Sequence, residues 1–295
     1  MQHEKCTELL AAGFIEKAPP NSYLYASNCV VPSKKDADGN HTERRFTVDL
    51  RAINEACETQ VYNPPTPEHI FGMIDGAQFI SRFDLRQSFH QIPLAEVDRC
   101  KLSFWWGRDL YRYKVMPMGH KNSSQKMQSV VDAEIHKYGW VQSVNAQGQH
   151  TEGNRRLEEC TKAYLDDLIC FSPTAEQHII DVAAMLKMLH QCGLRAHPQK
   201  TLVCADVLEF IGHNVGPYGL SPSEAKVAAI KAIPHPTNVK ELQSVLGFFN
   251  YYRSYVPMYS ALAFPLNRLL AKGVPFVWGP AEAKALNKIR DEMCM

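Results

Sequence analysis

The chain has 295 residues, a formal net charge of +1 and 45% hydrophobic residues, enough for a sizeable core and for more than one subdomain. The near-zero charge argues against a simple polyanion-binding protein, although a local basic groove is compatible with it because the local field decides binding. No segment approaches the roughly 20 apolar residues that a membrane span needs, so no membrane partner is expected.

The nine cysteines are scattered, and no two have the C-x-x-C spacing of a zinc ribbon or a redox motif. Several lie in apolar runs and are interpreted as small core residues in a reducing compartment. The N-terminus lacks the basic start and the long apolar stretch of a signal peptide. We therefore expect an intracellular protein, in a cytoplasmic particle or in the nucleus.

The first third of the chain predicts a short helix followed by a hairpin. Residues 4–17 have the pattern of an amphipathic helix that stops near a glycine. Strand-like segments at 22–33 and 45–54 flank a charged, turn-rich stretch, so the basic residues between them would lie at a hairpin tip. Pro67 can open a helix that ends near Gly76.

The middle of the chain alternates strands and helices. A period-2 pattern of side chains predicts a strand that ends near Asp84, and two short strand-like runs surround Gly107. Helices are expected over 122–138 and 174–192. Between them, residues 139–158 are polar, contain glycine and lack apolar periodicity, which indicates an exposed loop.

In the last third of the chain the pattern changes from strand-like to helix-like, and we place a subdomain boundary between residues 215 and 221. The letters SPSE at 221–224 form a capping box with proline at the first helical position. In a second helix, the apolar residues from Val239 to Phe249 recur at spacings of three and four, which places them on one face.

Two adjacent carboxylates interrupt the apolar run AYLDDLICF at residues 163–171. In one continuous strand, Asp166 and Asp167 would point to opposite faces, and one would be buried without a partner. If the strand turns there, both lie at a hairpin tip at the edge of a packed sheet. Asp-Asp is ordinary turn chemistry, but a divalent cation would also relieve the repulsion between the two anions, and aspartate oxygens suit Mg²⁺.

A third carboxylate bears on this choice. Asp84 ends the alternating strand in FDLRQSFHQ, and a lone aspartate at a strand end is usually a turn residue or a cap. Together with Asp166 and Asp167, however, it could hold two cations roughly 3.5–4 Å apart, as in phosphoryl-transfer polymerases.

Seven sequence blocks now give a more specific indication, because their order resembles the reverse transcriptase of a gypsy-type LTR retrotransposon. The blocks are VDLRAIN, FDLRQSFHQI, VMPMGHKNS, YLDD, EFIGH, LGFFNYYRSYV and GVPFVW. Tyr-x-Asp-Asp alone is a weak signal, whereas this order covers nearly the whole chain.

The resemblance implies an α+β right-hand polymerase, with fingers, an antiparallel palm sheet covered by helices on one face, and a helical thumb. Residues 1–220 would form fingers and palm. Residues 221–295 would form the thumb and the start of a connection toward a ribonuclease H domain missing from this chain, as in a segment of a Pol polyprotein.

The resemblance also implies a catalytic role for the carboxylates. Asp84 and Asp166 would bind two Mg²⁺ ions, for which Mn²⁺ could substitute. Asp167 would complete this acidic triad as a further catalytic and metal-binding residue. The ions would activate the primer 3′-hydroxyl and stabilise the pyrophosphate leaving group.

A second set of residues is implied to bind the incoming dNTP: Lys34, Lys35, Arg45, Phe89, Met118 and Gly119. Cations on a hairpin tip suit a triphosphate, since arginine binds phosphate bidentately, although a solvated basic loop would have the same sequence. Phe89 would be a steric gate against a 2′-hydroxyl, or a core side chain. Met118 stands where the family usually has phenylalanine.

A third set, Phe210, Ile211, Gly212 and His213, matches the primer grip, a turn that positions the primer end. Nearby, Tyr251, Tyr252 and Arg253 could lie along the minor groove of a duplex or simply pack, and both interpretations stay open. The main departure from the family pattern is the segment 139–158, which adds roughly twenty residues, an insertion that a closed surface loop tolerates.

The sequence thus predicts RNA-directed, and also DNA-directed, DNA synthesis from dNTPs on an RNA or DNA template with a primer. The alternative is a domesticated, non-catalytic scaffold that binds nucleic acid or assembles particles with the same fold. The intact acidic triad counts against it, and the segment 139–158 counts for it. An RNA-dependent RNA polymerase is disfavoured by Phe89. Oligomeric state and activity of this copy are left open.

Overall fold

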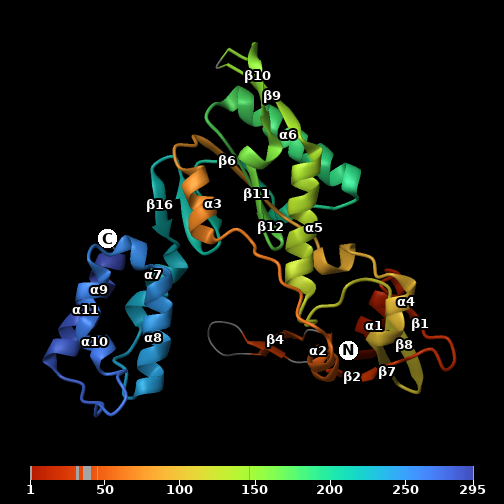
Figure 1. The fold of residues 1–295 in the computed structure, drawn as a ribbon, viewed down its shortest axis with the longest axis horizontal. Helices are drawn as coiled ribbons and strands as arrows, with labels where there is room; N and C mark the ends of the chain where they lie inside the picture. Colours follow the sequence, from red (N-terminus) through yellow and green to blue (C-terminus); the bar gives the residue numbers. More distant parts are fainter. Residues whose placement is uncertain (1, 31–32, 36–40, 45, 146, 295) are drawn as a thin grey trace. The chain divides into compact units, whose positions relative to one another are not determined.

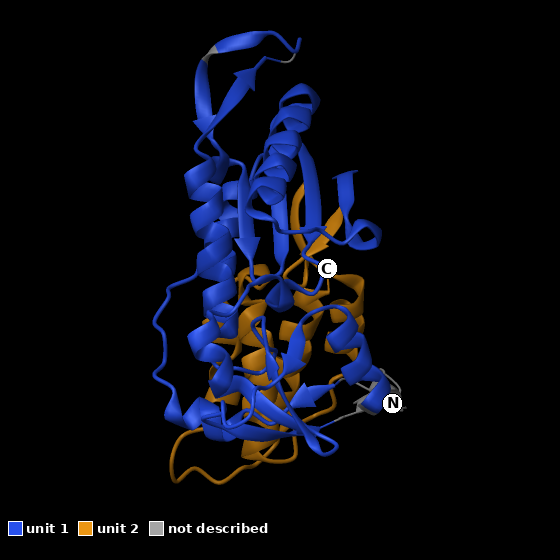
Figure 2. Cartoon of the chain, turned by 90° about the vertical axis from the view of Figure 1, so that its right-hand side faces the viewer, with its two compact units in different colours: residues 1–205 blue, residues 206–295 orange. Residues whose placement is uncertain are grey.

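The computed structural model describes residues 2–30, 33–35, 41–44, 46–145 and 147–294. The chain divides into two compact units, Met1–Ala205 and Asp206–Met295, which Figure 2 colours separately. Each unit has its own apolar core and is described by itself.

The first unit is built from helices and short strands that interleave along the chain (Figure 1). Its α-helices are α1 (Gln2–Ala11), α2 (Arg51–Ala56), α3 (Pro67–Ile74), α4 (Glu96–Arg99), α5 (Ser123–Tyr138) and α6 (Ala175–Cys192). Its 3-10 helices are η1 (Ser88–Gln91), η2 (Cys100–Leu102), η3 (Leu157–Glu159) and η4 (Pro198–Lys200). Its strands are β1 (Ile15–Lys17), β2 (Ala26–Val30), β3 (Ser33–Lys35), β4 (His41–Arg44), β5 (Thr47–Val48), β6 (Phe79–Asp84), β7 (Ser103–Trp106), β8 (Asp109–Tyr113), β9 (Trp140–Val144), β10 (His150–Arg156), β11 (Thr161–Tyr164), β12 (Asp167–Ser172) and β13 (Leu202–Ala205).

A four-stranded antiparallel sheet with the order β11-β12-β6-β13 forms the centre of the first unit. Helices α5 and α6 bury apolar side chains against it, including Val131 and Ile135 of α5 and Met185 of α6. The Thr174 side chain accepts a hydrogen bond from the Gln177 N–H at the start of α6, and Gly193 ends this helix in a left-handed conformation. The predictions of helices over 122–138 and 174–192 are confirmed.

A second sheet, with the order β1-β8-β7-β2-β5, packs on α1 and α2. Its strands are antiparallel except for β2 and β7, which run parallel. The antiparallel pairing of β2 with β5 confirms the predicted hairpin. The predicted strand over 45–54 is too long, because helix α2 begins at Arg51 and buries Ile53 in the core.

The segment 139–158 is largely exposed, as the sequence predicted, but it forms a hairpin of two strands instead of a loop. Strands β9 and β10 pair as an antiparallel hairpin with a bulge. Val141 and Leu157 are buried at its base. The amide of Gln177 in α6 satisfies the edge of β9, since Nε2 donates to the Gln142 carbonyl and Oε1 accepts from the Val144 N–H, at 3.0 and 2.7 Å. The polar composition of the segment gave no sign of these strands, because the side chains that bond to them belong to a later helix.

A buried ion pair fastens this hairpin to α6. Asp181 is fully buried, and its carboxylate accepts hydrogen bonds from Ser172 Oγ at 2.6 Å and Gln177 Nε2 at 2.9 Å. The Arg155 guanidinium, from β10, pairs with the same carboxylate. A buried carboxylate is tolerated only with such partners. The hairpin therefore supplies, through Arg155, the counterion of a carboxylate buried in the first unit.

The second unit contains the three-stranded antiparallel sheet β14-β15-β16 and the helices that follow it. The strands are β14 (Leu208–Phe210), β15 (His213–Gly216) and β16 (Gly219–Pro222). The helices are α7 (Glu224–Ala232), α8 (Val239–Tyr251), η5 (Arg253–Tyr255), α9 (Tyr259–Leu262), α10 (Phe264–Arg268) and α11 (Pro280–Met293). The unit begins at Asp206, earlier than the boundary expected between residues 215 and 221, because side chains of α8 and η5 bond to the first turn of this sheet.

The predicted capping box at 221–224 does not form. Pro222 ends strand β16, and helix α7 begins only at Glu224. Ser223 is the N-cap residue by backbone position, but its side chain makes no capping bond. The pairing of Pro222 with His213 across the sheet holds these residues in extended conformation instead. No helix in the described part of the chain is long and apolar enough to span a membrane.

We predict that Arg155→Met lowers the free energy of unfolding of the chain by about 3 kcal/mol, because it leaves the buried Asp181 carboxylate without its counterion. Urea denaturation followed by circular dichroism measures this loss. The matched control is Arg156→Met on the same strand, where the guanidinium pairs with the partly exposed Glu158 and should contribute no more than about 1 kcal/mol. Equal losses in the two variants would contradict a special role of the Arg155–Asp181 pair.

Candidate active site

Two of the three predicted carboxylates lie opposite each other across neighbouring strands. Strand β6 ends at Asp84, strand β12 begins at Asp167, and the antiparallel register pairs these two residues directly. Side chains of directly paired residues extend from the same face, with Cβ atoms about 4.5–5.5 Å apart. The register therefore brings together two carboxylates that are far apart in the sequence.

Asp166 lies in the two-residue turn between β11 and β12. Tyr164 pairs with Asp167, and Leu165, the first turn residue, has a positive φ of 58°. The Asp166 carbonyl accepts a hydrogen bond from the Leu85 N–H at 2.7 Å, which holds the turn against the end of β6. Only Asp166 is a turn residue, whereas Asp167 is already in the strand, so the two carboxylates do not share a hairpin tip in the way the sequence suggested.

A buried glutamine holds this turn in place. Gln128 of α5 is 1% exposed; its Nε2 donates to the Ala163 carbonyl at 2.8 Å, and its Oε1 accepts from the Leu165 N–H at 2.7 Å. A left-handed non-glycine residue costs on the order of 1 kcal/mol or more, and these bonds offset that cost. The sequence analysis missed Gln128, although a glutamine on the apolar face of a predicted helix is a signal that it needs buried partners.

Neighbouring cations only partly offset the negative charge of the three carboxylates. The pKa of Asp167 is raised to about 6, chiefly because the side chain is buried and further because Asp166 and Asp84 carry like charges, while Arg82 and Lys200 counteract this. Lys200 Nζ lies 3.2 Å from a carboxylate oxygen of Asp84. The sequence did not point to Lys200 either, because this residue ends the short helix η4 in a segment without a recognisable pattern and lies near Asp84 only once the chain is folded.

The three carboxylates suit a divalent cation by their chemistry. They supply only hard oxygen donors, and a cation would remove the like-charge repulsion that adds to the effect of burial on the pKa of Asp167. Across the described residues, no three His, Cys, Asp or Glu side chains already have the geometry of a metal site. Lys200 instead neutralises part of the charge at Asp84.

The residues predicted to bind dNTP are only partly described. Arg45 lies outside the described residues, and Lys34 and Lys35 are placed only as backbone positions of β3. Phe89 lies in η1, partly buried, and packs against the core below the four-stranded sheet. This packing agrees with the interpretation of Phe89 as a core side chain. The role of Phe89 as a steric gate stays a prediction.

Met118 and Gly119 lie in the segment that leads into α5. Met118 is 43% exposed, so its side chain is accessible. Gly119 has a φ of 88°, and its carbonyl accepts a hydrogen bond from Asn54 Nδ2 at 2.9 Å. The Asn54 Oδ1 in turn accepts from the Lys121 N–H at 2.9 Å. Asn54 therefore ties helix α2 to this segment through both ends of its side-chain amide.

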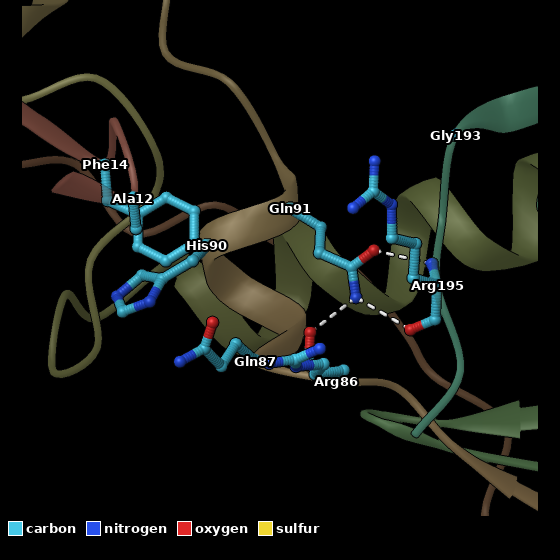
Figure 3. A pocket seen from close by; sticks show the side chains of 8 residues that line it. All are labelled: Ala12, Phe14, Arg86, Gln87, His90, Gln91, Gly193 and Arg195. Atoms are coloured by element: carbon cyan, nitrogen blue, oxygen red, sulfur yellow. Dashed lines mark hydrogen bonds between the residues drawn. The ribbon is translucent and has the colours of Figure 1, made fainter. Parts of the chain in front are cut away.

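A cavity of about 490 Å³ opens beside the chain that leaves Asp84, and Figure 3 shows the side chains that line it. One of them, Gln91, links the two segments that flank Asp84: its Nε2 donates to the carbonyls of Arg86 and Arg195, and its Oε1 accepts from the Arg195 N–H. The His197 N–H donates to the Asp84 carbonyl at 2.7 Å. These bonds hold the segment that carries Lys200 against the end of β6.

The residues predicted as the primer grip lie in the second unit and form one turn. Phe210 ends β14 and is fully buried, and His213 begins β15 and is 4% exposed. Ile211 and Gly212 lie between them, both with positive φ. The sequence prediction of a turn at these residues is confirmed, and its function stays a prediction.

The family model described as "Reverse transcriptase (RNA-dependent DNA polymerase)" matches residues 33–215. The chain is 29% identical over 265 residues to the "Retrovirus-related Pol polyprotein from transposon 297" of Drosophila melanogaster, covering 90% of this chain and 23% of the relative. It is 28% identical over 297 residues to the corresponding polyprotein from transposon gypsy of the same organism, covering 96% and 27%. The chain thus spans about a quarter of the length of these relatives.

Solved structures of the foamy viral protease-reverse transcriptase are also similar. One, in complex with double-stranded DNA, has a TM-score of 0.78 at 21% identity over 97% of this chain and 46% of that chain. Another, in complex with an RNA/DNA hybrid, has a TM-score of 0.72 at 21% identity over 98% and 36%. The α+β right-hand polymerase fold is thereby confirmed.

We predict that Asp167 makes the metal-free protein less stable as the pH rises. Its pKa of about 6 in the folded chain exceeds its ordinary value of 3.8, so the folded chain binds the proton more tightly than the unfolded chain. The penalty is absent below the lower value and fully present above the higher one. In EDTA, Asp167→Asn should therefore gain stability over the parent at about pH 7.5 and lose most of this gain near pH 4 to 5.

Urea denaturation at the two pH values measures the difference. Asp75→Asn, an exposed position after α3, is the control and should follow the parent at both. Parallel stability curves for Asp167→Asn and the parent would rule out a penalty from Asp167.

Proposed function

Because the chain belongs to the reverse transcriptase (RNA-dependent DNA polymerase) family, we propose that it synthesises DNA from dNTPs on a primed RNA template, and also on a DNA template. The observation that carries this proposal is the direct pairing of Asp84 with Asp167 beside the turn that presents Asp166. The family relationship alone would hold equally for an inactive copy. Three carboxylates held together by register and turn are what nucleotidyl transfer requires.

Within this proposal, Asp84 and Asp166 would hold two Mg²⁺ or Mn²⁺ ions, with Asp167 completing the set. Such ions, when bound, lower the pKa of the primer 3′-hydroxyl and stabilise negative charge on the leaving pyrophosphate. The chain itself contributes the positioning: Gln128 fixes the turn, and the Leu85 N–H fastens Asp166 to the end of β6. Lys200 supplies a cationic group close to Asp84.

The remaining predicted roles belong to the same proposal. Lys34, Lys35 and Arg45 would contact the triphosphate, Phe89 would exclude ribonucleotides, and Met118 with Gly119 would support the nucleotide. Residues 1–220 would supply fingers and palm, and residues 221–295 the thumb and the start of the connection. Support for a primer–template partner comes from the foamy viral relatives, which were solved with double-stranded DNA and with an RNA/DNA hybrid. Affinity for the duplex should come mainly from phosphate contacts and should fall with salt.

A non-catalytic scaffold that binds nucleic acid is the second candidate. The observation in its favour is the ion pair between Lys200 and Asp84, since an amine already occupies the carboxylate that a cation would need. The Lys200 side chain is 58% exposed, however, and ion pairs with a solvent-exposed member contribute little to stability. A divalent cation can therefore displace the Lys200 amine from Asp84. Activity of the purified chain decides between the two candidates.

We predict that the purified chain extends a DNA primer on an RNA template with dNTPs and Mg²⁺, and that Asp84→Asn and Asp166→Asn each reduce extension to background. The loss follows because an amide is a poor ligand for a hard cation. Asp75→Asn should extend like the parent. A primed DNA template in a parallel reaction tests DNA-directed synthesis. A folded parent that binds the duplex but extends nothing with Mg²⁺ or Mn²⁺ would leave the scaffold as the function.

We further predict that Phe89→Ala raises the efficiency of rNTP use relative to dNTP use by roughly 10–100-fold, because a shortened side chain no longer meets the 2′-hydroxyl. Single-nucleotide incorporation with matched dNTP and rNTP measures the ratio. Phe83→Ala, a fully buried position on β6, serves as the control for loss of core packing alone. If both variants lose activity without a change in the ratio, Phe89 is a core residue.

A further inference from the structure

The turn between β14 and β15 has a strained backbone. Phe210 pairs with His213, so Ile211 and Gly212 form a two-residue turn, with φ of 49° and 75°. Two successive positive φ values are typical of hairpin turns built from asparagine and glycine. Gly212 suits its position, whereas a β-branched residue such as Ile211 is disfavoured there. The sequence of this turn therefore does not by itself stabilise its shape.

Three tyrosines from one later segment bond to three successive residues of this turn. Tyr251 Oη donates to the Ile211 carbonyl at 2.6 Å, and Tyr252 Oη donates to the Gly212 carbonyl at 3.3 Å. The third bond joins Tyr255 Oη and His213 Nδ1 at 2.6 Å. All three tyrosines come from the end of α8 or from η5.

The rings of these tyrosines also enclose His213. Its ring centroid lies 5.1, 5.2 and 5.6 Å from those of Tyr251, Tyr252 and Tyr255. Tyr252 is 1% exposed and belongs to the core of the second unit, so its hydroxyl is held rigidly. A Cβ added at Gly212 would lie 3.2 Å from this hydroxyl, which shows how closely the turn is seated.

We propose that Tyr251, Tyr252 and Tyr255 are positioning residues that hold the strained turn 211–213 in the shape needed to place the primer 3′ end. This inference rests on the proposed function, in which the turn is the primer grip. Of the two interpretations left open for Tyr251 and Tyr252, their hydroxyl bonds to the turn of their own unit favour packing. Tyr251 is 41% exposed, so its ring remains accessible beside the turn.

The experiment uses Tyr251→Phe, Tyr252→Phe and Tyr255→Phe, singly and combined, because phenylalanine removes the hydroxyl and keeps the ring. Tyr218→Phe, a fully exposed tyrosine of the same unit, is the matched control. The duplex carries 2-aminopurine at the primer 3′ terminus, whose fluorescence reports stacking of that base without any chemistry. Primer extension gives kcat and KM, and matched and mismatched primer termini are compared.

We expect each of the first two substitutions to lower kcat about fivefold, the effect of one hydrogen bond of ordinary strength, with the affinity for duplex within about twofold of the parent. The 2-aminopurine fluorescence of the bound duplex should shift, and discrimination against a mismatched terminus should fall. Tyr218→Phe should match the parent in every measurement.

Two outcomes overturn the proposal. One is unchanged fluorescence and kcat in the combined variant. The other is a lowered melting temperature with unchanged fluorescence, which would make the tyrosines merely structural. If the parent binds the duplex but never extends the primer, the proposed function fails, while a fluorescence shift in the variants still supports positioning by the tyrosines. A parent that binds no duplex overturns both.

Discussion

The register between β6 and β12 is the constraint on which the candidate site depends. It pairs Asp84 with Asp167, and a slip by one residue would turn one of the two carboxylates to the opposite face of the sheet. The buried residues Phe83 and Leu168, paired next to the carboxylates, oppose such a slip because one of the two would leave the core. The packing of α5 and α6 on this sheet is thus a condition for the chemistry at its edge.

Two acidic groups next to the four-stranded sheet, Asp181 of α6 and Asp167 of β12, differ in how their charge is satisfied. Asp181 lies beneath the far end of β12 and is matched by an arginine, a serine and a glutamine, so it is a closed structural site. Asp167 begins β12, and its pKa is raised by burial and further by like charges that its cationic neighbours only partly offset. An acidic group that lacks such partners is destabilising, and groups with perturbed pKa values are concentrated at functional sites.

Strained turns occur at both sites that the function would use, and each is held by side chains from elsewhere in its unit. Gln128 bonds to the turn at Leu165, and Tyr251 and Tyr252, at the C-terminal end of α8, bond to the turn at Ile211 and Gly212. In both turns a bulky apolar residue has a positive φ. Hydrogen bonds from rigid helices therefore take the place of favourable turn residues, and they fix the turn more firmly than glycine would.

The sequence by itself determined the α+β class, the long helices α5 and α6, the strand ending at Asp84 and the identity of the three carboxylates, because periodicity and motif order are local properties. It did not show that 139–158 is a hairpin, since the partners of that segment, Gln177 and Asp181, lie on a later helix. It did not single out Lys200 or Gln128 either. Only the tertiary structure decided these points, because a charge or a hydrogen bond between residues far apart in the sequence exists only once register and packing bring them together.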